Sequence, residues 1–132
     1  MLRQLENFTR KALFGMDAES AHGLTIKALK AGIFIPAPKQ KDRRLSVQKA
    51  GLNFLNPLGI AAGFDKNAEV PDAILRLGFG FAEVGTITPK AQEGNPKPRV
   101  FRLVENKAVI NRLGFNNGGA DEALQRLEAR SH

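Results

Sequence analysis

Apolar residues recur at helical spacing near the start of the chain. Leu2, Leu5 and Phe8 are three residues apart, and charged residues fill most of the positions between them. This spacing predicts an amphipathic helix. A second helix is expected to begin after Asp17, a residue type that caps helix N-termini, and to stop at Gly32. The N-terminal part of the chain therefore predicts a pair of helices.

After residue 45 the pattern changes to short apolar runs that are separated by turns. Residues 45–47 and 52–54 predict a hairpin, and the continuous apolar run 58–63 predicts a strand that is buried on both faces of a parallel sheet. A helix that begins at Pro71 and a strand over residues 81–86 are expected next. This order of elements predicts a right-handed βαβ unit and an α/β fold.

A long insertion follows this unit and precedes a last predicted helix over residues 119–130. Within it, residues 100–104 and 108–110 flank a polar turn and predict a second hairpin. The next segment, residues 111–117, combines glycine turns with three asparagines, a polar edge that suits a small ligand rich in heteroatoms. Long loops often carry function, although on these residues alone an ordinary glycine-rich turn is the safer interpretation.

Composition limits the class of protein. The 132 residues predict one domain or a piece of one, and 42% hydrophobic and 25% charged residues are typical of a globular protein. The absence of cysteine excludes a disulfide framework and a thiolate site and suits a reducing compartment. No apolar run approaches the ~20 residues that a membrane span needs, and no cleaved signal peptide is expected.

The positive charge is concentrated at the N-terminal end. Of a net charge of +7, residues 1–49 supply most, with ten Lys and Arg against four Asp and Glu. Two interpretations of the basic helical pair have similar support. The helices dock on the rest of the protein, or they lie in the headgroup region of a membrane and offer an apolar slot to a lipid-soluble molecule.

Glycine-rich phosphate-binding motifs are missing, since the chain has neither GxGxxG after a strand nor GxxxxGKS/T. Residues 78–81 resemble the aromatic strand of RNA-recognition domains, but Ala82 and Val84 stand where that motif has other residue types. The basic charge leaves one alternative to an enzyme, which is a non-enzymatic basic α/β module that binds a membrane surface or RNA.

Three segments resemble the quinone-dependent (class 2) dihydroorotate dehydrogenases. They are residues 56–66 (NPLGIAAGFDK), 83–89 (EVGTITP) and 111–117 (NRLGFNN). Residues 94–99 (GNPKPR) and the N-terminal helical pair follow the family's order as well. The resemblance thus runs over essentially the whole chain.

The resemblance implies an α/β fold, an incomplete (β/α)₈ TIM barrel made of its first βα units and preceded by the N-terminal helical pair. Residues 1–44 would form a helical module for membrane and quinone access, and residues 45–132 the first, truncated part of an FMN-binding barrel. A complete barrel needs at least ~200 residues, and only 87 follow residue 45. The chain is therefore expected to be the N-terminal portion of such an enzyme.

The implied reaction is the oxidation of (S)-dihydroorotate to orotate in de novo pyrimidine (UMP) biosynthesis. FMN is the implied cofactor and a membrane quinone the electron acceptor, with peripheral contact at the cytoplasmic side of the cell membrane and no nucleic acid or metal as partner. The family's base is a serine on a later loop, and Ser20, Ser46 and Ser131 match no such motif. We expect the base beyond the C-terminus and no catalysis by this chain alone.

The resemblance also assigns site residues. Lys66 suits both the carboxylate of dihydroorotate and the negative charge of reduced flavin, although on its own it fits an ordinary surface lysine. His22, on the second helix, is expected to be structural more often than a quinone contact. The implied FMN contacts are Ala62, Gly63, Phe64, Asp65, Lys66 and Thr86. The implied substrate contacts are Lys66, Asn111, Arg112, Leu113, Gly114 and Phe115.

Overall fold

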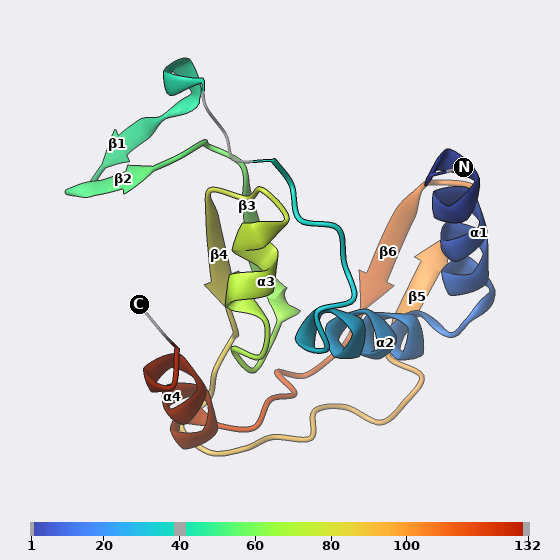
Figure 1. The fold of residues 1–132 in the computed structure, drawn as a ribbon. Helices are drawn as coiled ribbons and strands as arrows, with labels where there is room; N and C mark the ends of the chain where they lie inside the picture. Colours follow the sequence, from blue (N-terminus) through green and yellow to red (C-terminus); the bar gives the residue numbers. More distant parts are fainter. Residues whose placement is uncertain (1, 39–41, 131–132) are drawn as a thin grey trace.

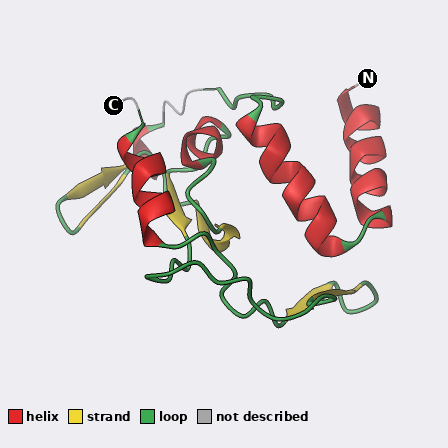
Figure 2. Ribbon diagram, turned by 90° about the horizontal axis from the view of Figure 1, so that it is seen from below, coloured by secondary structure: helices red, strands yellow, loops and turns green. Residues whose placement is uncertain are grey.

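The computed structural model of the protein describes residues 2–38 and 42–130. Its strands pair as β1–β2, β3–β4 and β5–β6, each pair a separate two-stranded sheet, and the helices lie between and beside these sheets (Figures 1 and 2). The elements in chain order are α1 (Leu2–Gly15), α2 (Ala18–Lys30), the 3₁₀ helix η1 (Arg43–Leu45), β1 (Val47–Lys49), β2 (Leu52–Phe54), β3 (Gly59–Asp65), α3 (Pro71–Arg76), β4 (Phe81–Val84), β5 (Val100–Leu103), β6 (Ala108–Asn111) and α4 (Ala120–Glu128).

The predicted N-terminal pair of helices is confirmed, with α1 and α2 packed against each other. Asp17 caps α2 as expected, since its carboxylate accepts a hydrogen bond of 2.8 Å from the backbone N–H of Ser20. The helix ends just before Gly32, whose φ of +74° lies in the left-handed region that favours glycine. Local sequence signals therefore set both ends of α2.

The hydrophobic core lies between α2 and the βαβ unit. Ile26 and Leu29 of α2 pack with Val70 and Ile74 at α3, and all four side chains are buried. Burying an aliphatic side chain of this size contributes roughly 1.5–3 kcal/mol. This contact holds α2 beside the loop that follows β3.

The predicted parallel pairing of the βαβ unit is confirmed. β3 runs parallel to β4, with Gly59 opposite Phe81, and α3 connects them with Pro71 in its first turn. The predicted burial of the first strand on both faces is wrong, because Ala61 and Gly63 are exposed. Only the face of β3 that carries Ile60 packs against the core beneath α3 and α2. Burial on both faces needs a second covering layer, and residues 61–63 of β3 have none.

Both predicted hairpins are present, with shifted ends. β1 pairs antiparallel with β2, but the first strand begins at Val47, because Leu45 belongs to η1. β5 pairs antiparallel with β6, with Val100 opposite Asn111. The first hairpin projects away from the helical pair, whereas the second lies beside it (Figure 1). The predicted C-terminal helix is confirmed as α4.

The predicted division of the chain into a helical module over residues 1–44 and a first part of a barrel over residues 45–132 stays a prediction.

Candidate functional site

Three segments that are far apart in the sequence meet around a cavity of about 310 Å³. The end of β3 with its following loop, the end of β4, and the turn after β6 each supply part of its wall. Neighbouring parallel strands end at the same edge of a sheet, so β3 and β4 bring their loops together there. The cavity is lined by Ala62, Gly63, Lys66, Gly85, Thr86, Asn111, Leu113, Gly114, Phe115 and Asn116.

The backbone at Gly63 leaves room for a flat ligand. Its φ is +100°, and no heavy atom lies within 4 Å of the point where a Cβ would stand. Its N–H donates a hydrogen bond of 2.7 Å to the carbonyl of Gly85, and the N–H of Gly85 donates one of 2.8 Å to the carbonyl of Asp65. These bonds fix the ends of β3 and β4 while a residue without a side chain lets a ring approach the backbone.

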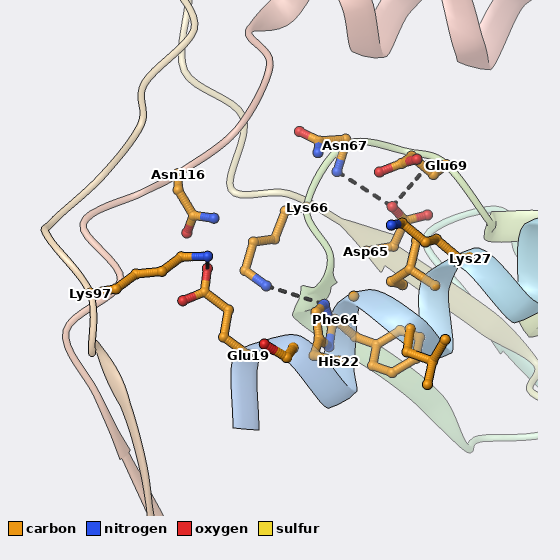
Figure 3. Close-up of a pocket in the computed structure, with 14 residues that line it drawn as sticks. Glu19, His22, Lys27, Phe64, Asp65, Lys66, Asn67, Glu69, Lys97 and Asn116 are labelled. Atoms are coloured by element: carbon orange, nitrogen blue, oxygen red, sulfur yellow. Dashed lines mark hydrogen bonds and ion pairs between the residues drawn. The ribbon is translucent and has the colours of Figure 1, made fainter. Parts of the chain in front are cut away.

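Lys66 supplies the positive charge of the cavity. Its side chain is half-buried, and its Nζ lies 3.3 Å from Nε2 of His22 on α2 (Figure 3). Burial lowers the pKa of the Lys66 ammonium, and the Glu19 carboxylate opposes this shift. A partly desolvated ammonium attracts an anion more strongly than a fully hydrated one.

The turn after β6 contributes a buried acceptor without a partner. Oδ1 of Asn116 is buried and accepts no hydrogen bond from the described residues. A buried acceptor that stays unpaired costs about 1–3 kcal/mol, so a ligand N–H there would be favoured. Asn117 differs, because its side chain is fully engaged with Thr88, the Phe115 carbonyl and the Gly119 N–H. Asn117 therefore shapes the turn, whereas the buried Oδ1 of Asn116 stays without a partner among the described residues.

Three residues that the resemblance assigned to ligands do not line this cavity. The Phe64 ring packs on His22, and the buried Asp65 carboxylate accepts hydrogen bonds from the N–H groups of Glu69 and Val70, 2.8 Å each. The Arg112 guanidinium donates to the Pro98 carbonyl at 3.1 Å. These side chains shape the loops, and their contacts with FMN or substrate stay predictions, as do those of the residues that do line the cavity.

Two lining residues were missing from the assigned contacts, Gly85 and Asn116, although Asn116 belongs to the predicted polar edge over residues 111–117. Both lie inside the segments that carry the resemblance, EVGTITP and NRLGFNN. Gly85 is buried at the end of β4, where only its backbone can face the cavity. The motifs thus contained both residues, but a motif does not show which of its residues face a cavity.

A second cavity of about 500 Å³ lies on the α2 side of Lys66 (Figure 3). Glu19 and His22 of α2 line it together with Lys66. Glu19 also pairs with the buried Arg99, with 2.6 Å between Oε1 and Nη2, and with Lys97 at 3.7 Å. Its hydrogen bond with Arg99 lowers the pKa of the Glu19 carboxyl. The helical pair therefore places an acid and an imidazole beside the lysine of the first cavity.

The residues of the first cavity fit a flavin and a pyrimidine. Gly63 admits a flat ring, Lys66 offers a cation, and the Thr86 hydroxyl can donate or accept a hydrogen bond. The unpaired Oδ1 of Asn116 needs an N–H donor, which both ring systems carry. The polar groups of the described lining residues are therefore compatible with both ligands.

Comparison with known proteins identifies the family. Residues 44–132 match the family model of dihydroorotate dehydrogenase. The chain is 63% identical over 126 residues to the mitochondrial dihydroorotate dehydrogenase (quinone) of Cyclocybe aegerita and 64% identical over 126 residues to the dihydroorotate dehydrogenase (quinone) of Brucella ovis. These alignments cover 96% of the chain but 38% and 34% of the two relatives, so the chain spans about a third of their length.

Solved structures agree with this assignment. Crystal structures of the Eimeria tenella dihydroorotate dehydrogenase superpose with TM-scores of 0.80 for the ferulenol complex and 0.82 for the ligand-free form, both at 52% identity. They cover 83% and 85% of the chain and 29% and 31% of the Eimeria chains. The short sheets and helices described above thus correspond to part of a larger α/β enzyme. The chain belongs to the dihydroorotate dehydrogenase family, and its curated relatives are the quinone-dependent members.

Proposed function

We propose that this chain is the N-terminal portion of a protein that oxidises (S)-dihydroorotate to orotate with FMN and passes the electrons to a membrane quinone. This reaction is a step of de novo pyrimidine biosynthesis. The observation that carries the proposal is the cavity in which Lys66, Thr86 and the asparagine-bearing turn meet around Gly63. The catalytic base and the closing strands of the barrel are assigned to a further part of the protein.

The FMN contacts follow from the cavity walls. Gly63 would admit the flavin ring, since no side chain blocks it, and Thr86 and Lys66 would offer hydrogen bonds to the cofactor. Bound FMN would supply the redox chemistry, accepting a hydride equivalent from dihydroorotate, with a membrane quinone as the final electron acceptor. The ammonium of Lys66 offsets the negative charge that this reduction adds.

The turn after β6 orients the pyrimidine. The amides of Asn111 and Asn116 can each donate to a carbonyl and accept from an N–H of the substrate. Phe115 is 63% exposed at the cavity, which leaves its ring free to cover the pyrimidine. Lys66 faces the substrate carboxylate. The residues of this chain therefore bind and orient the substrate, and a base outside the chain removes the proton from carbon 5 of dihydroorotate.

The helical pair is the proposed place of quinone entry and of peripheral contact with the cytoplasmic side of the cell membrane. Phe14 of α1, Leu24 of α2, and Ile33 and Ile35 after α2 are large apolar residues with about half or more of their surface exposed. Exposed apolar residues with basic neighbours favour the headgroup region of an anionic bilayer. Among the described residues, none of the helices has the length and hydrophobicity to cross a membrane.

A flavin titration of the full-length protein tests the proposal. The purified protein is expected to carry yellow FMN, and orotate is expected to perturb the flavin spectrum. Replacing the cation by Lys66→Ala should weaken orotate binding by about 10-fold or more, because a charge-assisted hydrogen bond is lost. A full-length protein that is colourless and binds RNA would support the non-enzymatic alternative instead.

Deleting residues 1–44 from the full-length protein tests the membrane assignment. Turnover with a quinone in lipid vesicles is expected to fall further than reduction of a water-soluble dye. Equal losses in the two assays would contradict quinone entry through the helical pair.

A further inference from the structure

An imidazole of the helical pair touches the lysine of the candidate site. Nε2 of His22 lies 3.3 Å from Nζ of Lys66, although the two residues are 44 positions apart. An ammonium group has only hydrogens to donate, so in this contact Lys66 is the donor and Nε2 the acceptor. The contact therefore requires a neutral imidazole with its proton on Nδ1.

The ring of His22 is held in place before any ligand binds. It packs edge-on against the ring of Phe64, with 5.3 Å between centroids and an angle of 87°. Burial, the largest effect, lowers the pKa of His22, and the Phe64 backbone opposes this shift.

The helix that carries His22 is itself fixed to the rest of the molecule. Ile26 and Leu29 anchor one side of α2 in the core, and the Glu19–Arg99 ion pair anchors its N-terminal end to the loop before β5. The position and ring orientation of His22 are thus set by groups outside the first cavity.

We propose that His22 is a positioning residue for Lys66, whose ammonium it holds by a hydrogen bond from the α2 side so that the cation faces the carboxylate of the pyrimidine substrate. This inference rests on the proposed function and deepens it. The helical pair then serves dihydroorotate binding as well as quinone entry. Deleting it should therefore weaken orotate binding, which a role in quinone entry alone does not require.

Protonation would break the contact. The charged groups around the imidazole are Lys66 and Asp65 from the end of β3 and its loop, and Glu19 from α2. Burial and then the Lys66 charge lower the pKa of His22 below its ordinary value of 6.5, so the ring is neutral at neutral pH. As the pH falls through that lowered pKa, the acceptor is lost and two cations repel each other.

Two variants separate hydrogen bonding from packing in the full-length, FMN-loaded protein. His22→Phe keeps a ring against Phe64 but offers no acceptor, whereas His22→Gln offers an amide oxygen near the place of Nε2. The measured quantity is the dissociation constant of orotate, read from the flavin spectrum. Lys27→Gln, an exposed change on the same helix, is the matched control.

The expected result is a loss of about 10-fold in orotate affinity for His22→Phe, with His22→Gln and Lys27→Gln within about 3-fold of the parent. The parent's affinity should also fall at acid pH, and His22→Gln should lack that fall. Equal affinities of the parent and His22→Phe would overturn the proposal. Equal losses in His22→Phe and His22→Gln would also overturn it, because packing would then explain both.

A spectroscopic measurement keeps the test independent of how well the variants fold. In the ¹⁵N-histidine NMR spectrum of the parent protein, His22 is expected as the Nδ1–H tautomer at neutral pH. A protonated Nε2 at that pH would end the proposal. Failure of the proposed function has a different result, since the parent itself would then bind neither FMN nor orotate.

Discussion

The two hairpins, β1–β2 and β5–β6, are both antiparallel strand pairs, but they are attached to the rest of the molecule in different ways. The β5–β6 hairpin is tied to the helical pair by two arginines, Arg99 through Glu19 and Arg102 through the carbonyls of Leu13, Phe14 and Met16. The β1–β2 hairpin meets the βαβ unit through an edge-on contact of two phenylalanine rings, with 5.6 Å between centroids. The strongly tied hairpin is also the one that leads into the site.

The difference shows how the site is held together. Arg99 donates to the carbonyls of Glu93 and Asn95, and Asn95 in turn hydrogen-bonds the carbonyls of Arg112 and Leu113. A network of polar contacts therefore runs from α2 to the segment that begins at Asn111, the end of β6, and includes Asn116. Among the described residues, the first hairpin takes part in no such network, so substitutions there should leave orotate affinity nearly unchanged.

Removing Arg99 is expected to have the largest effect. The Arg99→Ala change leaves the largely buried Glu19 without its main partner and frees two carbonyls, which should lower the free energy of unfolding by about 3 kcal/mol. Orotate affinity should fall as well. The measurements are thermal unfolding of the full-length protein and a flavin titration. The exposed Arg44, paired with Asp42 beside the first hairpin, is the control, and Arg44→Ala should change neither quantity.

Removing Arg102 is expected to have a smaller effect. Its guanidinium caps the C-terminal end of α1 and lies over the Phe14 ring, 5.1 Å from the centroid. Arg102→Ala should cost roughly 1 kcal/mol of unfolding free energy. Hydrogen exchange of α1 should accelerate while that of α3 does not. Uniform acceleration over the whole chain would show that Arg102 does not act locally.

The ring contact of the first hairpin is expected to matter less for the site. Phe54→Ala should destabilise the hairpin by about 1 kcal/mol, since the pair is T-shaped and partly exposed. Orotate affinity should stay within about 2-fold of the parent, because no polar network leads from Phe54 to the cavity. A loss as large as that of Arg99→Ala would remove the contrast between the two hairpins.

Acid pH should weaken the Glu19–Arg99 tie. The hydrogen bond with Arg99 lowers the pKa of Glu19 below its ordinary 4.5, so the folded state binds this proton less readily than the unfolded state. The stabilisation is present above pH 4.5 and is lost as the pH falls through the lowered pKa. The stability advantage of the parent over Glu19→Gln is therefore expected to shrink in acid, which unfolding midpoints at several pH values would measure.

The sequence by itself determined the local elements and the family. Helical spacing, the Asp17 cap and the polar turns predicted both helices of the pair and both hairpins, because these signals act between residues close in the chain. The three motifs also named most residues of the cavity, since each motif contains a whole loop. The burial of β3 was mispredicted, because an apolar run does not show how many layers will cover it.

Tertiary structure alone decided which distant groups meet. Nothing in the sequence placed His22 against Lys66, 44 positions away, or Glu19 against Arg99, 80 positions away. Such contacts depend on how α2 packs through Ile26 and Leu29, and a small rotation of that helix would point His22 elsewhere. Local propensity fixes which element forms, whereas packing of the assembled core fixes the direction in which its polar side chains point.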